Sequence, residues 1–369
     1  MQPIRVLHIV SRMERGGVET MLMNFFRMAD PEKLVFDFIV HSTQRAEYDD
    51  EIERLGGRIF RVRSKSESFI GNLKDVRGVV RDNRYHIVHV HQDAMSMFAL
   101  KEARHGGAAV RIAHAHSTSM PPSLMGNILY PYAVKRTARY ATHKFACSRA
   151  SAQYLFNGDV DGVTYVPNGI DTARFAFSEE KRSAFRAAHG LGDSFAVGQI
   201  ANFLYPKNHV FTLRVFAELL KERPDSRLVL CGSGPLLEEC KETARALGLD
   251  EKVSFLGNIS NVDAAISGLD ALIMPSIFEG FPVSMVEAQC SGLPCFVSGV
   301  ITRETGITGL VRYIPLDAPL SEWADEIGSA ADAYTEDRAS YCAAVTEKGY
   351  DIKKVSLWLQ DEYIRLAGF

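Results

Sequence analysis

The chain has 369 residues, which is long for a single hydrophobic core, so we expect two domains. Its 46% of hydrophobic residues exclude a disordered chain, and no apolar run approaches the roughly 18 residues of a membrane-spanning helix. The net charge of −3 conceals an asymmetry, because residues 1–170 carry 23 lysines and arginines against 17 acidic residues, and the remainder carries 19 against 28. A basic first half favours an anionic partner.

Strand and helix patterns alternate along the whole chain, which predicts an α/β protein with parallel sheets. The start, Met1-Gln2-Pro3-Ile4-Arg5, enters the first strand without the apolar core of a signal peptide. Strands of the first half are predicted at 4–10, 35–40, 58–62, 86–91, 110–116, 144–148 and 163–167. Its helices are predicted at 18–29, 68–83, 93–105, 123–141 and 149–156.

A second series follows a turn at 167–171 and a connection near 170–190. Its strands are predicted at 195–201, 227–231, 252–256, 270–274, 294–298 and 311–315. Its helices are predicted near 208–222, 235–248, 261–268, 283–291, 319–334 and 352–366. Together the two series predict two doubly wound domains. The six cysteines are scattered without a C-x-x-C pair, so we expect no disulfide framework, no zinc site and a reducing cytoplasmic compartment.

The predicted helix at 123–141 contains the run PYAVKRTARY at 131–140, which mixes cations with aromatic residues. Such a helix can lie on an anionic membrane surface. A solvated helix face is the alternative interpretation of the same charges.

The most informative stretch runs from Pro275 to Pro294, where a buried strand ends and a helix begins. Glu279 is expected in the strand-to-helix turn, and Glu287 about two turns into the helix. Pro282 suits the first turn of that helix, where a missing N–H costs nothing. The free N–H groups near Gly280 and Phe281 would form a site for an anion or a sugar hydroxyl.

The pattern Pro-Ser-x-x-Glu-Gly-Phe-Pro-x-x-x-x-Glu-Ala-x-x-Ser-Gly-Leu-Pro resembles the donor-site motif of the retaining glycosyltransferases of family 4, which have the GT-B fold. Four further segments are similar to motifs of that family: Gly16-Gly17-Val18-Glu19, Val166-Pro167-Asn168-Gly169-Ile170-Asp171, Lys207-Asn208-His209 and Cys231-Gly232-Ser233-Gly234-Pro235. The resemblance covers nearly the whole chain. It is closest to the branch that builds exopolysaccharides and other bacterial surface glycans.

The resemblance implies two Rossmann-like domains whose parallel sheets face each other across a cleft. Residues 1–172 would form the acceptor-side domain, 173–351 the donor-binding domain, and 352–369 would cross back onto the first. The implied reaction moves a sugar, with retention, from a nucleotide-sugar, foremost a UDP-sugar, to a glycan or lipid-linked acceptor. The resemblance also implies no cofactor and no nucleic-acid partner. It implies a cytoplasmic location, which can include the inner face of the membrane.

Two histidine pairs end neighbouring predicted strands, His89 with His91 and His114 with His116. Ligands bind at the carboxyl ends of strands in open parallel sheets, and strand alternation puts each pair on one face. A histidine at the end of the later strand contacts the donor sugar in related transferases, which implies His116 first and His114 second. His91 and His114 are acceptor-side candidates. A strand-end histidine that only hydrogen-bonds the backbone is the alternative.

Three glycine-containing segments are candidates for donor binding, because glycine lets the backbone approach a ligand closely. Gly16-Gly17 opens the first strand–helix unit, near the donor phosphates or the acceptor. Gly232-Ser233-Gly234 is a second such turn, although a turn needed only for packing requires the same residues. In Phe255-Leu256-Gly257-Asn258-Ile259 the base would rest against the backbone.

The resemblance gives the charged residues separate roles. Lys207 would contact the diphosphate, Glu287 the ribose hydroxyls and Glu279 the donor sugar. The family usually has an arginine where this chain has Asn202, which removes a cation from the leaving group. Low activity, compensation by another residue, or a different donor all remain open. No His/Asp cluster with metal-ligand spacing stands out, so we expect a metal-independent reaction.

Two other functions remain open from the sequence. One is a nucleotide-sugar epimerase with the same fold, which would need titratable groups on both sides of C2 of the sugar. The other is a nucleotide-sugar-binding partner subunit that has lost activity, an interpretation that Asn202 keeps open. Consumption of donor without change of the acceptor indicates the first, and binding without consumption indicates the second.

Overall fold

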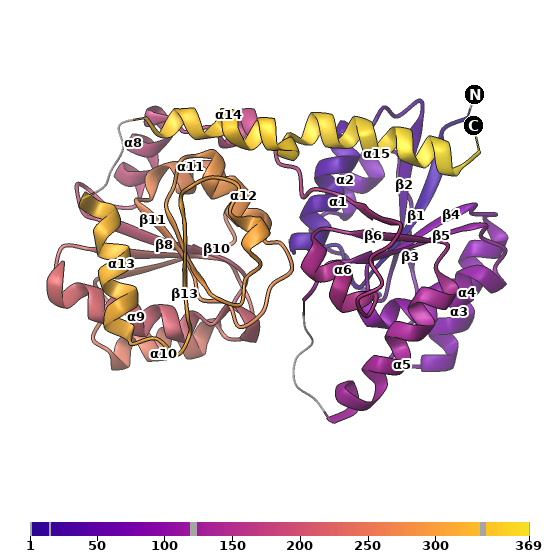
Figure 1. Ribbon diagram of the computed structural model, residues 1–369, viewed down its shortest axis with the longest axis horizontal. Coiled ribbons are helices and arrows are strands. Elements are labelled where there is room, and N and C mark those ends of the chain that lie inside the picture. Colours follow the sequence, from indigo (N-terminus) through magenta and orange to yellow (C-terminus); the bar gives the residue numbers. More distant parts are fainter. Residues whose placement is uncertain (1, 15, 119–123, 333–336, 369) are drawn as a thin grey trace. The chain divides into compact units, whose positions relative to one another are not determined.

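The computed structural model describes residues 2–14, 16–118, 124–332 and 337–368, with backbone only for 124–129 and 331–332. The chain forms two compact units (Figure 1). The first unit comprises Met1–Gly169 together with Asp351–Phe369, and the second comprises Ile170–Tyr350. These limits differ by one to three residues from the domain limits expected from the sequence.

The first unit contains one parallel sheet in the order β3-β2-β1-β4-β5-β6-β7. Its strands are β1 (Ile4–Val10), β2 (Leu34–Val40), β3 (Ile59–Arg61), β4 (Ile87–Val90), β5 (Val110–Ala115), β6 (His143–Ala146) and β7 (Val163–Tyr165). Its helices are α1 (Gly17–Met28), α2 (Asp49–Arg54), α3 (Phe69–Asp82), η1 (Asp93–Met95), α4 (Ser96–His105), α5 (Leu124–Tyr140), α6 (Arg149–Leu155) and α15 (Ile352–Leu366).

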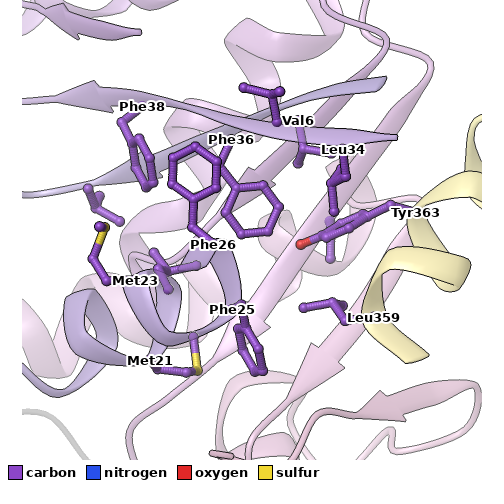
Figure 2. Close-up of a cluster of buried hydrophobic side chains, with 14 of the residues drawn as sticks. Val6, Met21, Met23, Phe25, Phe26, Leu34, Phe36, Phe38, Leu359 and Tyr363 are labelled. Atoms are coloured by element: carbon purple, nitrogen blue, oxygen red, sulfur yellow. The ribbon is translucent and has the colours of Figure 1, made fainter. Parts of the chain in front are cut away.

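The C-terminal helix α15 packs with α1 against one face of this sheet. Every residue of β2 is buried, as expected for a parallel strand covered on both faces. Phe36 and Phe38 of β2 lie among side chains from α1, and Leu359 and Tyr363 of α15 complete the cluster (Figure 2). The Ser356 hydroxyl also donates to the carbonyl of Phe25, 3.3 Å away. Helix α15 is therefore part of the core of the first unit.

The second unit has a parallel sheet in the order β10-β9-β8-β11-β12-β13. Its strands are β8 (Ala196–Ile200), β9 (Arg227–Cys231), β10 (Val253–Gly257), β11 (Ala271–Met274), β12 (Cys295–Ser298) and β13 (Val311–Ile314). Its longer helices are α8 (Glu179–Ala188), α9 (His209–Glu222), α10 (Leu237–Ala246), α11 (Val262–Gly268), α12 (Val283–Cys290) and α13 (Leu320–Asp332). Shorter helical segments are α7 (Thr172–Phe175), η2 (Tyr205–Lys207), η3 (Arg303–Thr305), η4 (Arg338–Ser340), α14 (Tyr341–Val345) and η5 (Thr346–Tyr350).

All thirteen strands of the described part of the chain were predicted, with ends within two residues. The segment near 170–190, predicted only as a connection, contains α7 and α8, which were not predicted. Helix α8 begins with a regular signal: Ser178 caps it by accepting from the N–H of Lys181, and Glu179 and Glu180 occupy its first turn. The prediction also placed helix ends at residues 123, 333 and 334, which lie outside the described residues.

Three smaller observations complete the fold. Helix α12 begins at Val283, so Pro282 is its N-cap residue and not part of its first turn as predicted. None of the helices in the described ranges combines the length and the apolar character that crossing a bilayer requires. The six cysteines are free thiols, in agreement with the expected absence of disulfides.

Candidate functional site

Five histidines of the first unit gather on one face of its sheet, towards the carboxyl ends of the strands. They come from three neighbouring strands, because β1 pairs with β4 and β4 with β5. We name two hydrogen-bonded rows. The outer histidine row is His8, His91 and His116, and the inner histidine row is Tyr363, His89 and His114. The predicted site residues His91, His114 and His116 are thus brought together.

Each row is continuous. In the outer row, His8 Nδ1 lies 3.0 Å from His91 Nε2, and His91 Nδ1 lies 2.9 Å from His116 Nε2. In the inner row, His89 Nδ1 lies 2.7 Å from the Tyr363 hydroxyl, and His89 Nε2 lies 3.1 Å from His114 Nδ1. Both rows begin in the core, where Nε2 of His8 is buried without a partner among the described residues.

Burial keeps these imidazoles neutral, because the charged form loses its solvation. It lowers the pKa of His8 to about 3 and the pKa of His116 to about 4. The pKa values of His89, His91 and His114 are also lowered well below the ordinary value by burial. The alternative of a histidine that only bonds the backbone does not describe this cluster, because its rings bond one another.

Asp93 holds the backbone at His116. Its carboxylate accepts from the N–H of His116 at 2.9 Å and from the N–H and hydroxyl of Ser117 at 3.3 and 2.8 Å. Asp93 has a φ of +44°, a left-handed conformation that is uncommon outside glycine and that concentrates at functional sites. The position of His116 is therefore set by Asp93 through the backbone and by His91 through the ring.

Ring nitrogens of two histidine triplets, His8-His89-His91 and His91-His114-His116, approach one another within 4.8 Å. The search for metal-ligand spacing in the sequence missed both triplets. A metal needs three lone pairs that point at one centre. Here the facing nitrogens of each row are at hydrogen-bond distance, and the rings of His89 and His91 stack with an interplanar angle of 25°. This arrangement favours a hydrogen-bonded network.

The glycine turn before α1 carries a carboxyl group that the sequence analysis did not single out as a site residue. A Cβ on Gly16 would lie 2.2 Å from Oε2 of Glu19, so the carboxyl folds back over the helix N-terminus into space that a side chain at residue 16 would share. Gly17 meets no such restriction. Burial raises the pKa of Glu19 to about 7. A carboxyl thus occupies the position at which an anion was expected.

In the second unit, Lys207 and Glu279 form an ion pair, although they are 72 residues apart in the sequence. The Ser276 hydroxyl also donates to Glu279 Oε1 at 2.9 Å. Two backbone-anchoring bonds hold the segments together: Asn208 Nδ2 donates to the carbonyl of Pro275 at 3.1 Å, and the N–H of Ile277 donates to the carbonyl of Pro206 at 2.8 Å. Lys207, predicted to contact the diphosphate, and Glu279, predicted to contact the donor sugar, are therefore neighbours at the carboxyl edge of this sheet.

The second glycine turn has a clear packing role. Gly232 has a φ of +143°, and a Cβ there would lie 2.1 Å from the carbonyl oxygen of Ala201. Gly234 likewise meets the carbonyl of Phe203, at 2.5 Å. The two glycines therefore let the turn pack closely against the segment that carries Asn202. This supports the interpretation that the glycines are needed for packing. Gly257 joins the same group, since its carbonyl accepts from the N–H of Gly232 at 2.8 Å.

Glu287 lies on α12 with only 8% of its surface exposed. Burial raises its pKa to about 7, while Arg174 lowers it and Asp263 raises it further. Among the described residues its carboxyl group has no hydrogen-bond partner. Arg174 itself binds Asp263 at 2.9 Å. Glu287 and Glu279 therefore face different charged groups, and the structure does not join them in one carboxylate pair.

The remaining predicted residues surround these groups within the second unit. Gly280 is buried, and the Phe281 ring stacks on Tyr350 with centroids 5.6 Å apart. Asn258 is exposed beyond the end of β10. Sequence reasoning missed His8, although its position in the apolar strand Ile4–Val10 was a usable signal, because a histidine there must face a buried surface.

Two sequence families match this chain. The family described as "Glycosyltransferase Family 4" matches residues 15–174, and "Glycosyl transferases group 1" matches residues 181–304. The "Putative glycosyltransferase EpsF" of Bacillus subtilis is 37% identical over 359 residues, which are 95% of this chain and 94% of the relative. An Escherichia coli protein, "UDP-Gal:alpha-D-GlcNAc-diphosphoundecaprenol alpha-1,3-galactosyltransferase", is 23% identical over 80% of both chains.

Solved structures of the same architecture exist. The Anabaena protein Alr3699/HepE, in complex with UDP-glucose, superimposes with a TM-score of 0.81 and 17% sequence identity. The superposition covers 98% of this chain and 99% of the Anabaena chain. At this level of identity the likeness establishes the fold alone.

Proposed function

Because the chain belongs to glycosyltransferase family 4 and has the GT-B fold, we propose that it moves a sugar, with retention, from a UDP-sugar to a glycan or lipid-linked acceptor in surface-polysaccharide synthesis. The proposal includes donor binding by the second unit and acceptor binding by the first. The observation that carries it is the Lys207–Glu279 ion pair at the carboxyl edge of the second sheet, followed in the chain by helix α12 with its buried Glu287.

The second unit has the groups that a nucleoside diphosphate sugar needs. Lys207 offers a mobile positive charge to the diphosphate, and the N–H groups at the start of α12 offer dipoles of the same sign. Glu287 offers two carboxylate oxygens to a vicinal diol, as in ribose. Because Glu279 holds Lys207 in this structure, an arriving diphosphate would share the lysine with Glu279 or displace it.

In the proposed reaction the acceptor hydroxyl attacks the anomeric carbon on the face from which the diphosphate leaves. The C–O bond to the diphosphate breaks, and the hydroxyl proton passes to the departing phosphate oxygen. Lys207 and the backbone N–H groups stabilise the charge that develops on the leaving group. This route needs no protein nucleophile and, in our proposal, no cofactor or metal. His116 would contact the donor sugar.

The choice of UDP and of a lipid-linked acceptor has two supports. The Anabaena neighbour binds UDP-glucose, and the Escherichia coli relative is named for transfer from UDP-Gal to a diphosphoundecaprenol-linked sugar. Helix α5 concerns membrane contact instead, since Tyr132, Lys135 and Arg139 are exposed while Val134 and Thr137 of the same helix are buried. We propose that this face lies on the inner surface of the cytoplasmic membrane. Flotation with anionic and with neutral vesicles tests this contact.

The test of function is a screen of UDP-sugars with lipid-linked and free glycan acceptors, followed by UDP release and by NMR of the product. We expect UDP release that depends on the acceptor, and an α-linked product from an α-linked donor. Donor consumption with an unchanged acceptor would indicate the epimerase. UDP binding without consumption would indicate a partner subunit.

The role of His116 is tested in the same assay. His116→Ala should lower turnover and leave the affinity for UDP nearly unchanged, because UDP lacks the sugar. His114→Ala should have a smaller effect. The reverse ranking would transfer the role to His114.

A further inference from the structure

The outer histidine row limits how His116 can form hydrogen bonds. A neutral imidazole has one N–H donor and one bare nitrogen acceptor. Each contact in the row joins two ring nitrogens, so one must donate and the other accept. Because the row is continuous from His8 through His91 to His116, its protons can be arranged in only two ways.

In the first arrangement, each ring carries its proton on Nδ1, and the donors of His8 and His91 point towards His116. His8 Nδ1 then donates to His91 Nε2, and His91 Nδ1 donates to His116 Nε2. In the second arrangement, every Nε2 carries the proton, the donors point inward, and His8 is left with a buried Nε2–H.

The buried end of the row decides between them. His8 is fully buried, its Nε2 has no partner among the described residues, and its ring lies 4.3 Å from Phe36 and 5.6 Å from Phe38, measured between ring centroids. Either arrangement leaves Nε2 of His8 unpaired, but a buried N–H without an acceptor is rarer in proteins than a buried acceptor without a donor. The first arrangement is therefore favoured.

We propose that His8 and His91 are positioning residues that hold His116 as the Nδ1–H tautomer, so that His116 meets the donor sugar as a hydrogen-bond donor and not as a base. This rests on the proposed contact between His116 and the donor sugar. In the described part of the chain, the side-chain bond to the His116 ring involves Nε2, which leaves Nδ1 as the nitrogen to meet a ligand. The hydrogen bond made by one ring nitrogen sets the proton on the other.

The Asp93 carboxylate fixes the backbone that carries this ring. It accepts from the backbone N–H of His116 at 2.9 Å. A donor at His116 also agrees with same-face displacement, which needs no general base on the protein. The sugar atom that the Nδ1–H meets would be an oxygen, since oxygen atoms are the hydrogen-bond acceptors of a hexose.

The direct test measures tautomers without any substrate. The full-length chain is labelled with ¹⁵N-histidine, and two-bond proton–nitrogen correlations are recorded at neutral pH, with assignment by His116→Gln. We expect His116 and His91 to carry the proton on Nδ1 and to have a bare Nε2. Protonation on Nε2 of His116 overturns the proposal. Since no donor is present, this outcome is independent of whether the proposed function is correct.

The kinetic test uses substitutions of His8, the buried end of the outer histidine row. Asparagine places an amide nitrogen near the position of Nδ1, so His8→Asn keeps the donor to His91, whereas His8→Leu removes it. We expect His8→Leu to lower kcat by about tenfold, the worth of one hydrogen bond felt in the transition state, with the affinity for UDP unchanged. His8→Asn should recover most of this loss.

Tyr363→Phe is the matched control, because it removes one buried hydrogen bond to a histidine of the inner row. It should leave kcat as in the wild type. Equal losses in His8→Leu and Tyr363→Phe would show that only packing matters and would overturn the proposal. Elemental analysis of the purified chain completes the test, since a stoichiometric metal ion that His91→Ala removes would occupy the bare nitrogens and exclude this tautomer row.

Discussion

Burial determines the behaviour of Glu287 more strongly than any charged neighbour does. It raises the pKa of this carboxyl group from the ordinary value of 4.5 to about 7, and the opposing effect of Arg174 is smaller. The folded chain therefore keeps a proton on Glu287 between these two pH values, where the unfolded chain has lost it. Stability should fall as the pH rises through this interval, because the folded chain then binds more protons than the unfolded chain.

We predict that Glu287→Gln has opposite effects on stability and on binding. Above pH 7 the variant should be more stable than the wild type, by at most about 3 kcal/mol, because each unit of pKa shift corresponds to about 1.4 kcal/mol. Its affinity for UDP at pH 8 should fall by roughly 10- to 150-fold, the loss of hydrogen bonds to a charged group. Urea denaturation at pH 5 and pH 8, and calorimetry with UDP, measure the two effects.

Glu251→Gln is the control, since this carboxyl group is exposed in the same unit. It should change neither quantity. Unchanged UDP affinity in a folded Glu287→Gln variant would remove Glu287 from the nucleotide site.

A second prediction concerns the cation beside Glu279. Lys207→Ala should nearly abolish turnover, because Asn202 supplies no second charge to the leaving group. Lys207→Arg should retain part of it. Asn202→Arg should raise turnover or tighten UDP binding, since an arginine fork on a phosphate is worth on the order of 1–3 kcal/mol. Steady-state kinetics at fixed ionic strength would measure all three.

The two substitutions would contradict this prediction in different ways. A silent Lys207→Ala would mean that the diphosphate binds elsewhere. A silent Asn202→Arg in a well-folded protein would mean that another residue already supplies the charge.

At the scale of elements, the turn after β9 and the segment after β8 depend on each other. The N–H of Phe203 donates to the carbonyl of Ser233 at 2.8 Å, and the N–H of Leu236 donates to the carbonyl of Phe203 at 3.2 Å. The glycines permit this approach because any Cβ at Gly232 would overlap the backbone. The turn thus places Asn202 even if it never contacts a ligand.

We predict that Gly232→Ala lowers the stability of the second unit by roughly 2 kcal/mol or more, through steric overlap and an unfavourable φ. Gly257→Ala is the matched control. Its φ is also positive, at +67°, but no atom lies within 4 Å of the new Cβ, so the cost should be only about 1 kcal/mol. Denaturation curves measure both. Equal losses would show that backbone conformation alone, and not contact with the 201–203 segment, requires the glycine.

At the scale of the whole molecule, the chain leaves the first unit after Gly169 and returns to it at Asp351. The returning helix α15 contributes Leu359 and Tyr363 to the core and a hydrogen bond from the N–H of Asp30 to Gln360, 2.9 Å long. Its last turns also bring the Tyr363 hydroxyl to the inner histidine row. The stability of the first unit should therefore depend on the last residues of the chain.

We predict that Leu359→Ala loosens the first unit and leaves the second unchanged. A buried Leu→Ala change costs about 2–5 kcal/mol. Hydrogen exchange should accelerate in peptides from β1, β2 and α1, and stay as in the wild type in peptides from β8 to β12. Leu357→Ala, at a site with 58% exposure on the same helix, is the control and should change neither. Faster exchange in both units would mean that they unfold together.

The sequence by itself determined what depends on residues close together in the chain. The thirteen strands were predictable because parallel strands covered on both faces are short apolar runs. The donor motif from Pro275 to Pro294 was visible because its residues are contiguous. The fold class, and the family that the resemblance indicated, are confirmed by the architecture and by the relatives. Helix α8 was predictable in the same way, because its N-cap Ser178 and its acidic first turn are local signals.

The tertiary structure alone decided which distant residues meet. The pair of Lys207 with Glu279 and the row from His8 to His116 join segments whose distance in space depends on strand order. Strand order follows from how whole helices and strands pack, and a local pattern of side chains does not encode it. The same holds for the pKa of Glu287, because burial is a property of the assembled core. Local chemistry thus identified candidate residues, and packing assigned their partners, their protons and their charges.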